Sequence, residues 1–182
     1  MNTTRINRQR VKAKPQEIDF KKIISQVAST LQKQDGAHLL NINTTIEGIF
    51  PFVADKEMME LVVTNMVSNA IRFRHPHESK PTLNIHIELS PDMAMLSFKD
   101  NGIGIDAQYL PRVFDMFFCV PGQKTEGSGI GLFATREAVK KMKGTIHVQS
   151  IKGTGTTFTA SIPNRMDPDM KRKITKIIEN SK

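Results

Sequence analysis

Two asparagines lie one helical turn apart in a segment with a helical pattern of apolar residues. Asn65 and Asn69 are followed by Arg72, so the three side chains are spaced i, i+4 and i+7 and share one helix face. Carboxamide oxygens suit a hydrated Mg²⁺, and a guanidinium is a forked donor to phosphate. Asparagine is a poor helix former, so two of them among valines and methionines favour a functional reason. A polar stripe that merely faces water is the alternative.

Two glycine-containing loops follow this segment. Asp100 to Gly104 reads Asp-Asn-Gly-Ile-Gly, in which a buried carboxylate could accept from an exocyclic amine such as that of adenine. Taken alone, this composition predicts only a β-turn. Gly127 to Leu132 reads Gly-Ser-Gly-Ile-Gly-Leu and opens a predicted helix, where free amides and the helix dipole favour phosphate. Such a loop is a weak signal by itself and gains weight from the two earlier segments.

The elements that must position these segments belong to an α+β fold. Apolar periodicity predicts helices over 19–33, 55–74, 107–114 and 129–142, with a short helix from 170 onward. Alternating apolar residues predict strands over 83–89, 94–98, 146–150 and 156–162, and 39–46 is β-rich. Asp55 is the expected N-cap of the second helix. We expect a two-layer sandwich in which a mixed, mostly antiparallel sheet carries its helices on one face.

Length and composition allow one ordinary domain with a real core. The chain has 182 residues, of which 38% are hydrophobic. Its apolar runs fall far below the roughly 18 residues that span a bilayer, and the basic start lacks the apolar stretch of a signal peptide. The single cysteine, Cys119, excludes an internal disulfide and fits a reducing compartment.

The net charge of +8 is confined to the ends of the chain. Residues 1–14 carry five bases and no acid, and residues 164–182 carry six bases and three acids, which leaves a neutral body. A nucleic-acid groove needs bases gathered on a folded face, often with stacking aromatics, and the chain has no tryptophan and one tyrosine. The charge therefore predicts solvated tails and no nucleic-acid partner.

In their order and spacing, the three motifs resemble the ATP-binding catalytic domain of two-component sensor histidine kinases, in the wider family of gyrase, Hsp90 and the mismatch-repair ATPases. The resemblance covers residues 17–163, and the segments from Asn69 to Pro76 and from Lys124 to Gly131 are similar to histidine kinases of the Bacteroidetes type. It implies a Bergerat-type fold. Residues 1–16 would then be a basic linker at the end of a dimerisation helix, and 164–182 a basic tail.

The resemblance also implies roles for individual residues. Asn69 would be the Mg²⁺ ligand and Asn65 would support the triphosphate, while Asp100 would accept from adenine N6 with Thr156 beside it through water. Arg72 and Phe73 replace a lysine and a tyrosine of the family pattern. The expected catalytic residues are Asn65, Asn69, Arg72 and Lys124. The expected ATP site comprises Asn65, Asn69, Arg72, Phe73, Asp100, Gly102, Gly104, Ile105, Lys124, Gly127, Ser128, Gly129, Ile130, Gly131, Leu132 and Thr156.

Residues 106–126 resemble the mobile ATP lid of the family. Phe114, Phe117 and Phe118 match its aromatic box, although such residues are more often part of a core. Met116 and Cys119 stand where the family pattern has arginines, which removes two phosphate contacts. Lys124 is the expected substitute at the γ-phosphate, with a solvated loop lysine as the alternative.

The implied reaction is transfer of the γ-phosphoryl of Mg-ATP to a histidine. Hydrolytic relatives have a glutamate four residues before the metal asparagine, and Asn65 cannot act as that general base. His75 and His77 lie in a predicted loop, so the acceptor would belong to a dimerisation domain outside this sequence, and a response-regulator receiver domain would take the phosphoryl group next. The chain would be a cytoplasmic domain without membrane contact of its own, in a kinase that is membrane-anchored or free.

Two other classes stay open. One is a nucleotide-binding module with weak or no kinase activity, which the missing lid arginines favour. The other is an ATPase or serine kinase of the same fold, including the anti-sigma-factor type. Binding without transfer would indicate the first, and ATP turnover without an acceptor would indicate the second.

Overall fold

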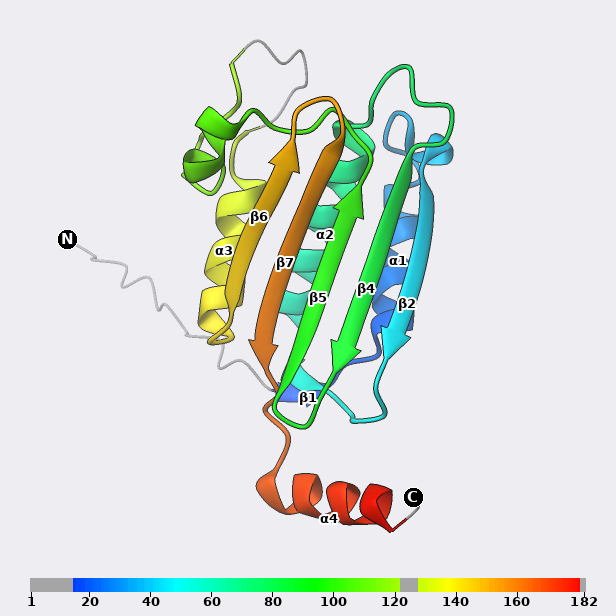
Figure 1. Cartoon of the computed structure of the whole chain (residues 1–182), viewed down its shortest axis with the longest axis vertical. Helices are drawn as coiled ribbons and strands as arrows, with labels where there is room; N and C mark the ends of the chain where they lie inside the picture. Colours follow the sequence, from blue (N-terminus) through cyan, green and yellow to red (C-terminus); the bar gives the residue numbers. More distant parts are fainter. Residues whose placement is uncertain (1–14, 122–127, 181–182) are drawn as a thin grey trace, which may run out of the picture.

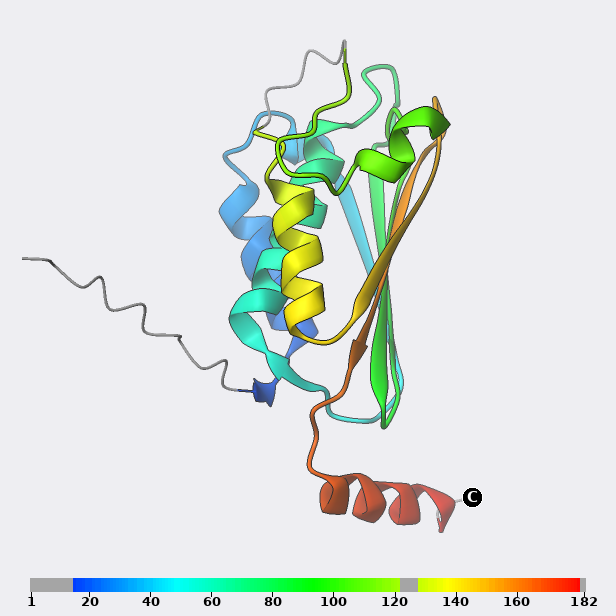
Figure 2. The ribbon, with the colours of Figure 1, turned by 90° about the vertical axis from the view of Figure 1, so that its left-hand side faces the viewer.

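Three helices cover one face of a five-stranded sheet, as the two views in Figures 1 and 2 show. The computed structural model describes residues 15–121 and 128–180. The strand order is β2-β4-β5-β7-β6, and a separate two-stranded sheet pairs β1 with β3. The strands are β1 (Pro15–Glu17), β2 (Asn41–Glu47), β3 (Val53–Asp55), β4 (Thr82–Leu89), β5 (Met93–Asp100), β6 (Thr145–Ile151) and β7 (Gly155–Pro163). The helices are α1 (Phe20–Leu31), α2 (Lys56–Arg72), α3 (Gly131–Lys141) and α4 (Pro168–Glu179), with short 3-10 turns η1 (Ala37–Leu39) and η2 (Ala107–Arg112).

The sheet is mixed, because β2 runs parallel to β4 while its three other pairings are antiparallel. Alternation along β4 places Leu83, Ile85 and Ile87 in the core and turns the intervening residues to the outer face. On the outer face, β7 carries small polar residues such as Thr159, which lies opposite Ser97, while β5 also exposes Met93 and Met95 there. The predicted α+β sandwich with helices on one face is confirmed.

Helix α2 lies at the centre of the helical layer between α1 and α3 (Figure 1). The Asp55 carboxylate caps it by accepting from the Met58 N–H at 2.9 Å, as the sequence predicted. Met59, Val62, Val63, Met66 and Val67 are buried in the core. The helix ends at Arg72, two residues before the predicted end, and the Phe73 N–H still donates to the Asn69 carbonyl.

The short pair β1–β3 and the terminal helix α4 lie at the same end of the domain (Figure 1). Neither β1 nor β3 was predicted, and β1 begins within the segment expected to be a linker. Buried Asn164 ties this end together: its Oδ1 accepts from the Val53 N–H, and its Nδ2 donates to the Pro51 carbonyl. This end of the fold is therefore held by hydrogen bonds to the backbone, which the pattern of apolar residues in the sequence does not predict.

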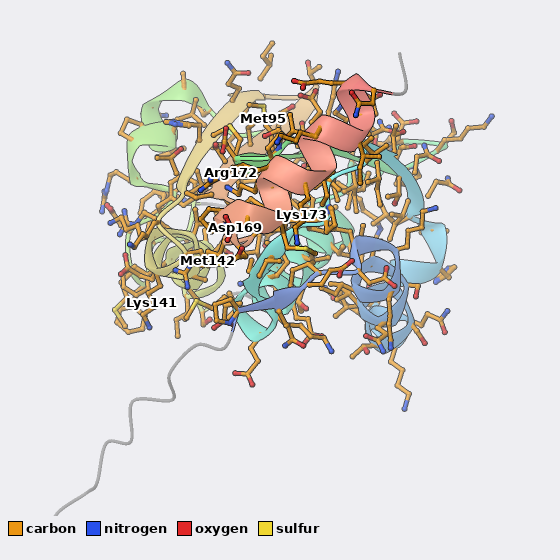
Figure 3. The ribbon with its side chains drawn as sticks, turned by 90° about the horizontal axis from the view of Figure 1, so that it is seen from below. Met95, Lys141, Met142, Asp169, Arg172 and Lys173 are labelled. Carbon is orange, nitrogen blue, oxygen red and sulfur yellow. The ribbon has the colours of Figure 1, made fainter. Side chains whose placement is uncertain are left out.

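The C-terminal helix α4 starts at Pro168, two residues before the predicted start, with Asp167 as its N-cap. Figure 3 shows it lying across the end of the domain, with Asp169, Arg172 and Lys173 along it. None of its residues is buried, and Lys171 pairs with Asp92 of the β4–β5 turn at 3.4 Å. In the described ranges, no helix has both the length and the apolar character needed to span a bilayer.

Candidate functional site

A cavity opens at the end of the domain opposite α4, between the ends of α2 and β5 and the start of α3. Polar groups and apolar walls both line it. The lining residues are Asn69, Arg72, Phe73, Asp100, Gly104, Ile105, Val113, Phe118, Cys119, Val120, Ser128, Gly129, Gly131, Leu132, Thr156 and Phe158. The structure thus brings together three segments that are far apart in sequence.

Asp100 is the carboxylate of this cavity. Its Oδ1 accepts from two main-chain donors, the Gly102 N–H at 2.9 Å and the Thr156 N–H at 3.1 Å. None of the described residues donates to Oδ2, which is therefore available to a ligand. Burial raises the pKa of the Asp100 carboxyl above its ordinary value, against the opposing effect of the two N–H donors. The chemistry suits a neutral donor such as an exocyclic amine.

Ser150 fixes the surroundings of this carboxylate. Its hydroxyl donates to the Gly155 carbonyl at 2.8 Å, lies 2.9 Å from the Thr156 hydroxyl, and accepts from the Ile105 N–H at 2.8 Å. The Thr156 N–H also donates directly to Asp100 Oδ1, and the contact through water that the resemblance implied stays a prediction. Gly104, at φ +64°, packs so closely against the Ile151 carbonyl that no Cβ would fit.

Asn69 and Arg72 line the cavity from the C-terminal half of α2. Arg72 has no ion pair with any carboxylate of the described ranges, in contrast with Arg74, which pairs with Asp35 at 3.8 Å. An amide oxygen and an unpaired guanidinium on one wall are suited to a metal-bound polyphosphate.

Asn65 lies deeper and does not line the cavity. Its Nδ2 donates to the Gly131 carbonyl and to the Thr135 hydroxyl, both at 3.0 Å. Thr135 is fully buried, and its hydroxyl donates to the Gly131 carbonyl at 2.9 Å. The first residue of α3 is thereby linked directly to α2.

The glycine loop leads into α3, and residues of the loop and of the first turn of that helix line the cavity. Gly129 has φ +67° and its carbonyl accepts from the Phe117 N–H at 3.0 Å, so the loop rests against the segment after η2. Ser128, Gly131 and Leu132 line the cavity. Helix N-termini of this kind favour anions through free N–H groups and the helix dipole.

The three lid phenylalanines have three different environments. Phe114 packs edge-on against Phe158 at a centroid distance of 6.2 Å, while Phe118 lines the cavity beneath the Arg112 guanidinium at 4.5 Å. Phe117 is 65% exposed, so the alternative of a core residue does not hold for it.

Eleven of the predicted site residues line the cavity. They are Asn69, Arg72, Phe73, Asp100, Gly104, Ile105, Ser128, Gly129, Gly131, Leu132 and Thr156. Gly102 supports Asp100 from behind, Asn65 supports Gly131, and Ile130 is 40% exposed beside α3. Lys124 and Gly127 lie outside the described residues. The sequence did not single out Val113, Val120, Ser150 or Thr135, because single apolar or hydroxyl residues carry no spacing signal.

The histidines lie away from the cavity lining. His75 and His77 follow α2 in a loop, as predicted. His86 lies on the outer face of β4, where its Nε2 is 3.0 Å from Glu88 and 4.0 Å from Glu47. Glu47, His86 and Glu88 form the one cluster of potential metal ligands within residues 15–121 and 128–180. The cluster lies on the sheet face opposite the helices.

The fold and the cavity define a nucleotide-binding domain of a known class. The family model described as "Histidine kinase-, DNA gyrase B-, and HSP90-like ATPase" matches residues 54–166, which is more than half of the chain. The chain belongs to this family. The part of sensor kinases that it matches is their ATP-binding catalytic domain, so the resemblance stated from the motifs is confirmed.

Two curated relatives are sensor proteins. Sensor protein RprX of Bacteroides fragilis is 30% identical over 161 residues, which cover 86% of this chain and 31% of that protein. The aerobic respiration control sensor protein ArcB of Escherichia coli is 29% identical over 164 residues, which cover 87% of this chain and 21% of that protein. The chain thus spans less than a third of the length of these relatives.

Solved structures show the same fold. The mycobacterial sensor histidine kinase MprB has a TM-score of 0.69 and 22% identity, covering 85% of this chain and 100% of that chain. Full-length ShkA in complex with AMPPNP has a TM-score of 0.70 and 19% identity, covering 86% of this chain and 32% of that one.

Proposed function

We propose that this chain binds Mg-ATP and transfers its γ-phosphoryl group to a histidine supplied by a dimerisation domain. The observation that carries the proposal is the hydrogen bonding of Asp100, which lines the cavity: Oδ1 accepts from two main-chain N–H groups, whereas Oδ2 accepts from none of the described residues. An adenine amino group supplies such a donor, and a guanine carbonyl at the same ring position does not.

The phosphate end of the cavity supports the same function. Asn69 offers an amide oxygen to Mg²⁺, Arg72 offers its guanidinium to the phosphates, and the N-terminus of α3 offers main-chain amides. Phosphoryl transfer needs positioning and charge neutralisation more than covalent help. A neutral imidazole is already nucleophilic near neutral pH, so the reaction does not require a strong base.

Hydrolysis is less well supported than transfer. The position of the general base in hydrolytic relatives is taken here by Asn65, whose amide nitrogen is engaged by Gly131 and Thr135. An amide cannot take a proton from water at neutral pH. We therefore expect the isolated chain to release phosphate from ATP no faster than the buffer control.

The partners follow from the reaction. A phosphohistidine formed on the dimerisation domain would pass its phosphoryl group to an aspartate of a response-regulator receiver domain. The chain would act as the cytoplasmic domain of such a kinase, whether that kinase is anchored in a membrane or free.

Calorimetric titration of the chain with Mg-AMPPNP and Mg-GMPPNP tests the binding step. We expect saturable binding of the adenine nucleotide and binding of the guanine nucleotide at least about tenfold weaker. Asn69→Ala should weaken Mg-AMPPNP, and Asn43→Ala on the exposed face of β2 should not. No binding at millimolar nucleotide would refute the proposal.

Incubation with γ-labelled ATP and a purified phosphoacceptor domain of a sensor kinase tests the transfer step. Acid-labile, alkali-stable label on that domain is the expected product. Label that is acid-stable, or phosphate release in the absence of an acceptor, would instead indicate a serine kinase or an ATPase.

A further inference from the structure

Three polar groups from α2 and α3 form a closed hydrogen-bonded triangle. The Asn65 amide nitrogen donates to the Gly131 carbonyl and to the Thr135 hydroxyl, and that hydroxyl donates to the same carbonyl. All three distances lie between 2.9 and 3.0 Å. Thr135 is fully shielded from solvent, so no water competes for its hydroxyl.

The triangle fixes which end of the Asn65 side chain a ligand can meet. A carbonyl oxygen can only accept, so the group that faces Gly131 must be the amide NH₂. Both of its hydrogens are then used, one by Gly131 and one by Thr135. The Asn65 Oδ1 is left over, and it lies 3.4 Å from the point where a Cβ of Gly131 would stand, directly behind this residue of the cavity lining.

An oxygen acceptor cannot bind a phosphate oxygen, which is itself an acceptor at neutral pH. It can bind a magnesium ion or accept from a water molecule that the ion holds. The role of Asn65 in supporting the triphosphate is therefore indirect and passes through the metal. Rotation of the amide by half a turn would remove this oxygen and present a donor in its place.

We propose that Thr135 is a positioning residue for the magnesium ion of the bound nucleotide, acting through the orientation of the Asn65 amide. The inference rests on the proposed function, because it concerns the metal of Mg-ATP. Without the hydroxyl, one amide hydrogen loses its acceptor, and the amide is held by Gly131 alone. The metal-dependent part of nucleotide affinity then falls, while contacts to adenine are unchanged.

The experiment compares AMPPNP affinity in excess Mg²⁺ with AMPPNP affinity in EDTA, by calorimetry on the whole chain. Thr135→Val removes the hydroxyl at nearly constant volume, and Thr135→Ser retains it. Thr30→Val is the matched control, because the Thr30 hydroxyl makes the same bond to the carbonyl four residues earlier but lies exposed on α1 with no asparagine on it. Thermal unfolding of each variant reports its stability.

For Thr135→Val we expect affinity in Mg²⁺ to fall about three- to tenfold, with affinity in EDTA unchanged. Thr135→Ser and Thr30→Val should match the wild type in both conditions. An equal loss in Mg²⁺ and in EDTA would overturn the inference in favour of a purely structural role, and no loss in either would overturn it outright. A wild-type chain that binds no nucleotide would refute the proposed function itself, which distinguishes the two failures.

Discussion

The main-chain N–H of Thr156 donates to Oδ1 of Asp100 at 3.1 Å and thereby joins the start of β7 to the end of β5. The two strands are antiparallel neighbours in the middle of the sheet, so their pairing brings this contact about. The carboxylate that would recognise the base is thus oriented by the backbone of the sheet. Oδ2 of Asp100 accepts from none of the described residues and can accept from a ligand. The burial of the carboxyl group raises its pKa.

Asp100→Asn should weaken AMPPNP binding by about tenfold or more, because an amide NH₂ would face the amino group of adenine. The same substitution should leave the free energy of unfolding at pH 7 unchanged or higher. Burial raises the pKa of Asp100, so the folded state binds a proton more tightly than the unfolded state does. The wild type therefore loses stability as pH rises from the ordinary carboxyl pKa through the raised value.

Urea unfolding of wild type and Asp100→Asn at pH 7 and near pH 4 checks this sign. The stability advantage of the variant should shrink toward pH 4, where the wild-type carboxyl gains its proton. The opposite result would be a variant that is less stable than the wild type, with a larger deficit at pH 7 than at pH 4. It would show that the ionised carboxylate stabilises the fold.

Arg72→Ala should weaken AMPPNP about tenfold or more and leave AMP binding nearly unchanged, because a charge-assisted bond to the outer phosphates is lost. Arg74→Ala is the matched control, since Arg74 lies two residues away but bonds to Asp35 and to the Ile71 carbonyl. Calorimetry with both nucleotides measures the difference. Equal weakening of AMP and AMPPNP by Arg72→Ala would place the guanidinium away from the phosphates.

Gly129→Ala should reduce nucleotide affinity, because a Cβ there would meet the Phe117 backbone at 2.5 to 2.7 Å and displace the glycine loop. Gly153→Ala is the control for backbone strain alone. Its φ is also positive, at +80°, but nothing lies within 4 Å of the added Cβ, so no neighbouring segment is displaced. Both variants pay the left-handed backbone cost of about 1–2 kcal/mol in stability. If Gly153→Ala lowers affinity as much as Gly129→Ala, general destabilisation is the cause.

Asn164→Ala should lower the free energy of unfolding by about 1–3 kcal/mol, because it leaves the part-buried Val53 N–H and Pro51 carbonyl without their partner. Asn84→Ala on the exposed face of β4 should change it by less than about 0.5 kcal/mol. Urea unfolding gives both values. Near-equal values for the two variants would show that the Asn164 contacts do not stabilise the domain.

Local chemistry made much of this architecture predictable. Asp55 could be recognised as an N-cap, and the alternation of Leu83, Ile85 and Ile87 fixed the buried face of β4. The residues of the three motifs were also predictable, because their types and their short spacing within each motif indicate a nucleotide site. Eleven of sixteen expected ATP-site residues line the cavity for this reason.

What stayed hidden depends on long-range contacts. The three-residue strand β1 forms because it pairs with β3, where Gln16 lies opposite Ala54, 38 positions later. Three residues are too few to show a periodicity. Thr135 lies one turn into a helix and becomes significant only when Asn65, 70 positions earlier, reaches it. A hydroxyl of this kind has no sequence signature, because its role is set by its partner.

The end of the domain that carries β1 and α4 also has a mechanical consequence. Strand β1 and helix α4 both lie at the end of the domain opposite the cavity (Figure 1). The described chain enters the fold at β1 and ends just after α4. A segment attached at that end would therefore not cross the cavity, and under the proposed function the nucleotide end of the domain would stay accessible to a phosphoryl acceptor.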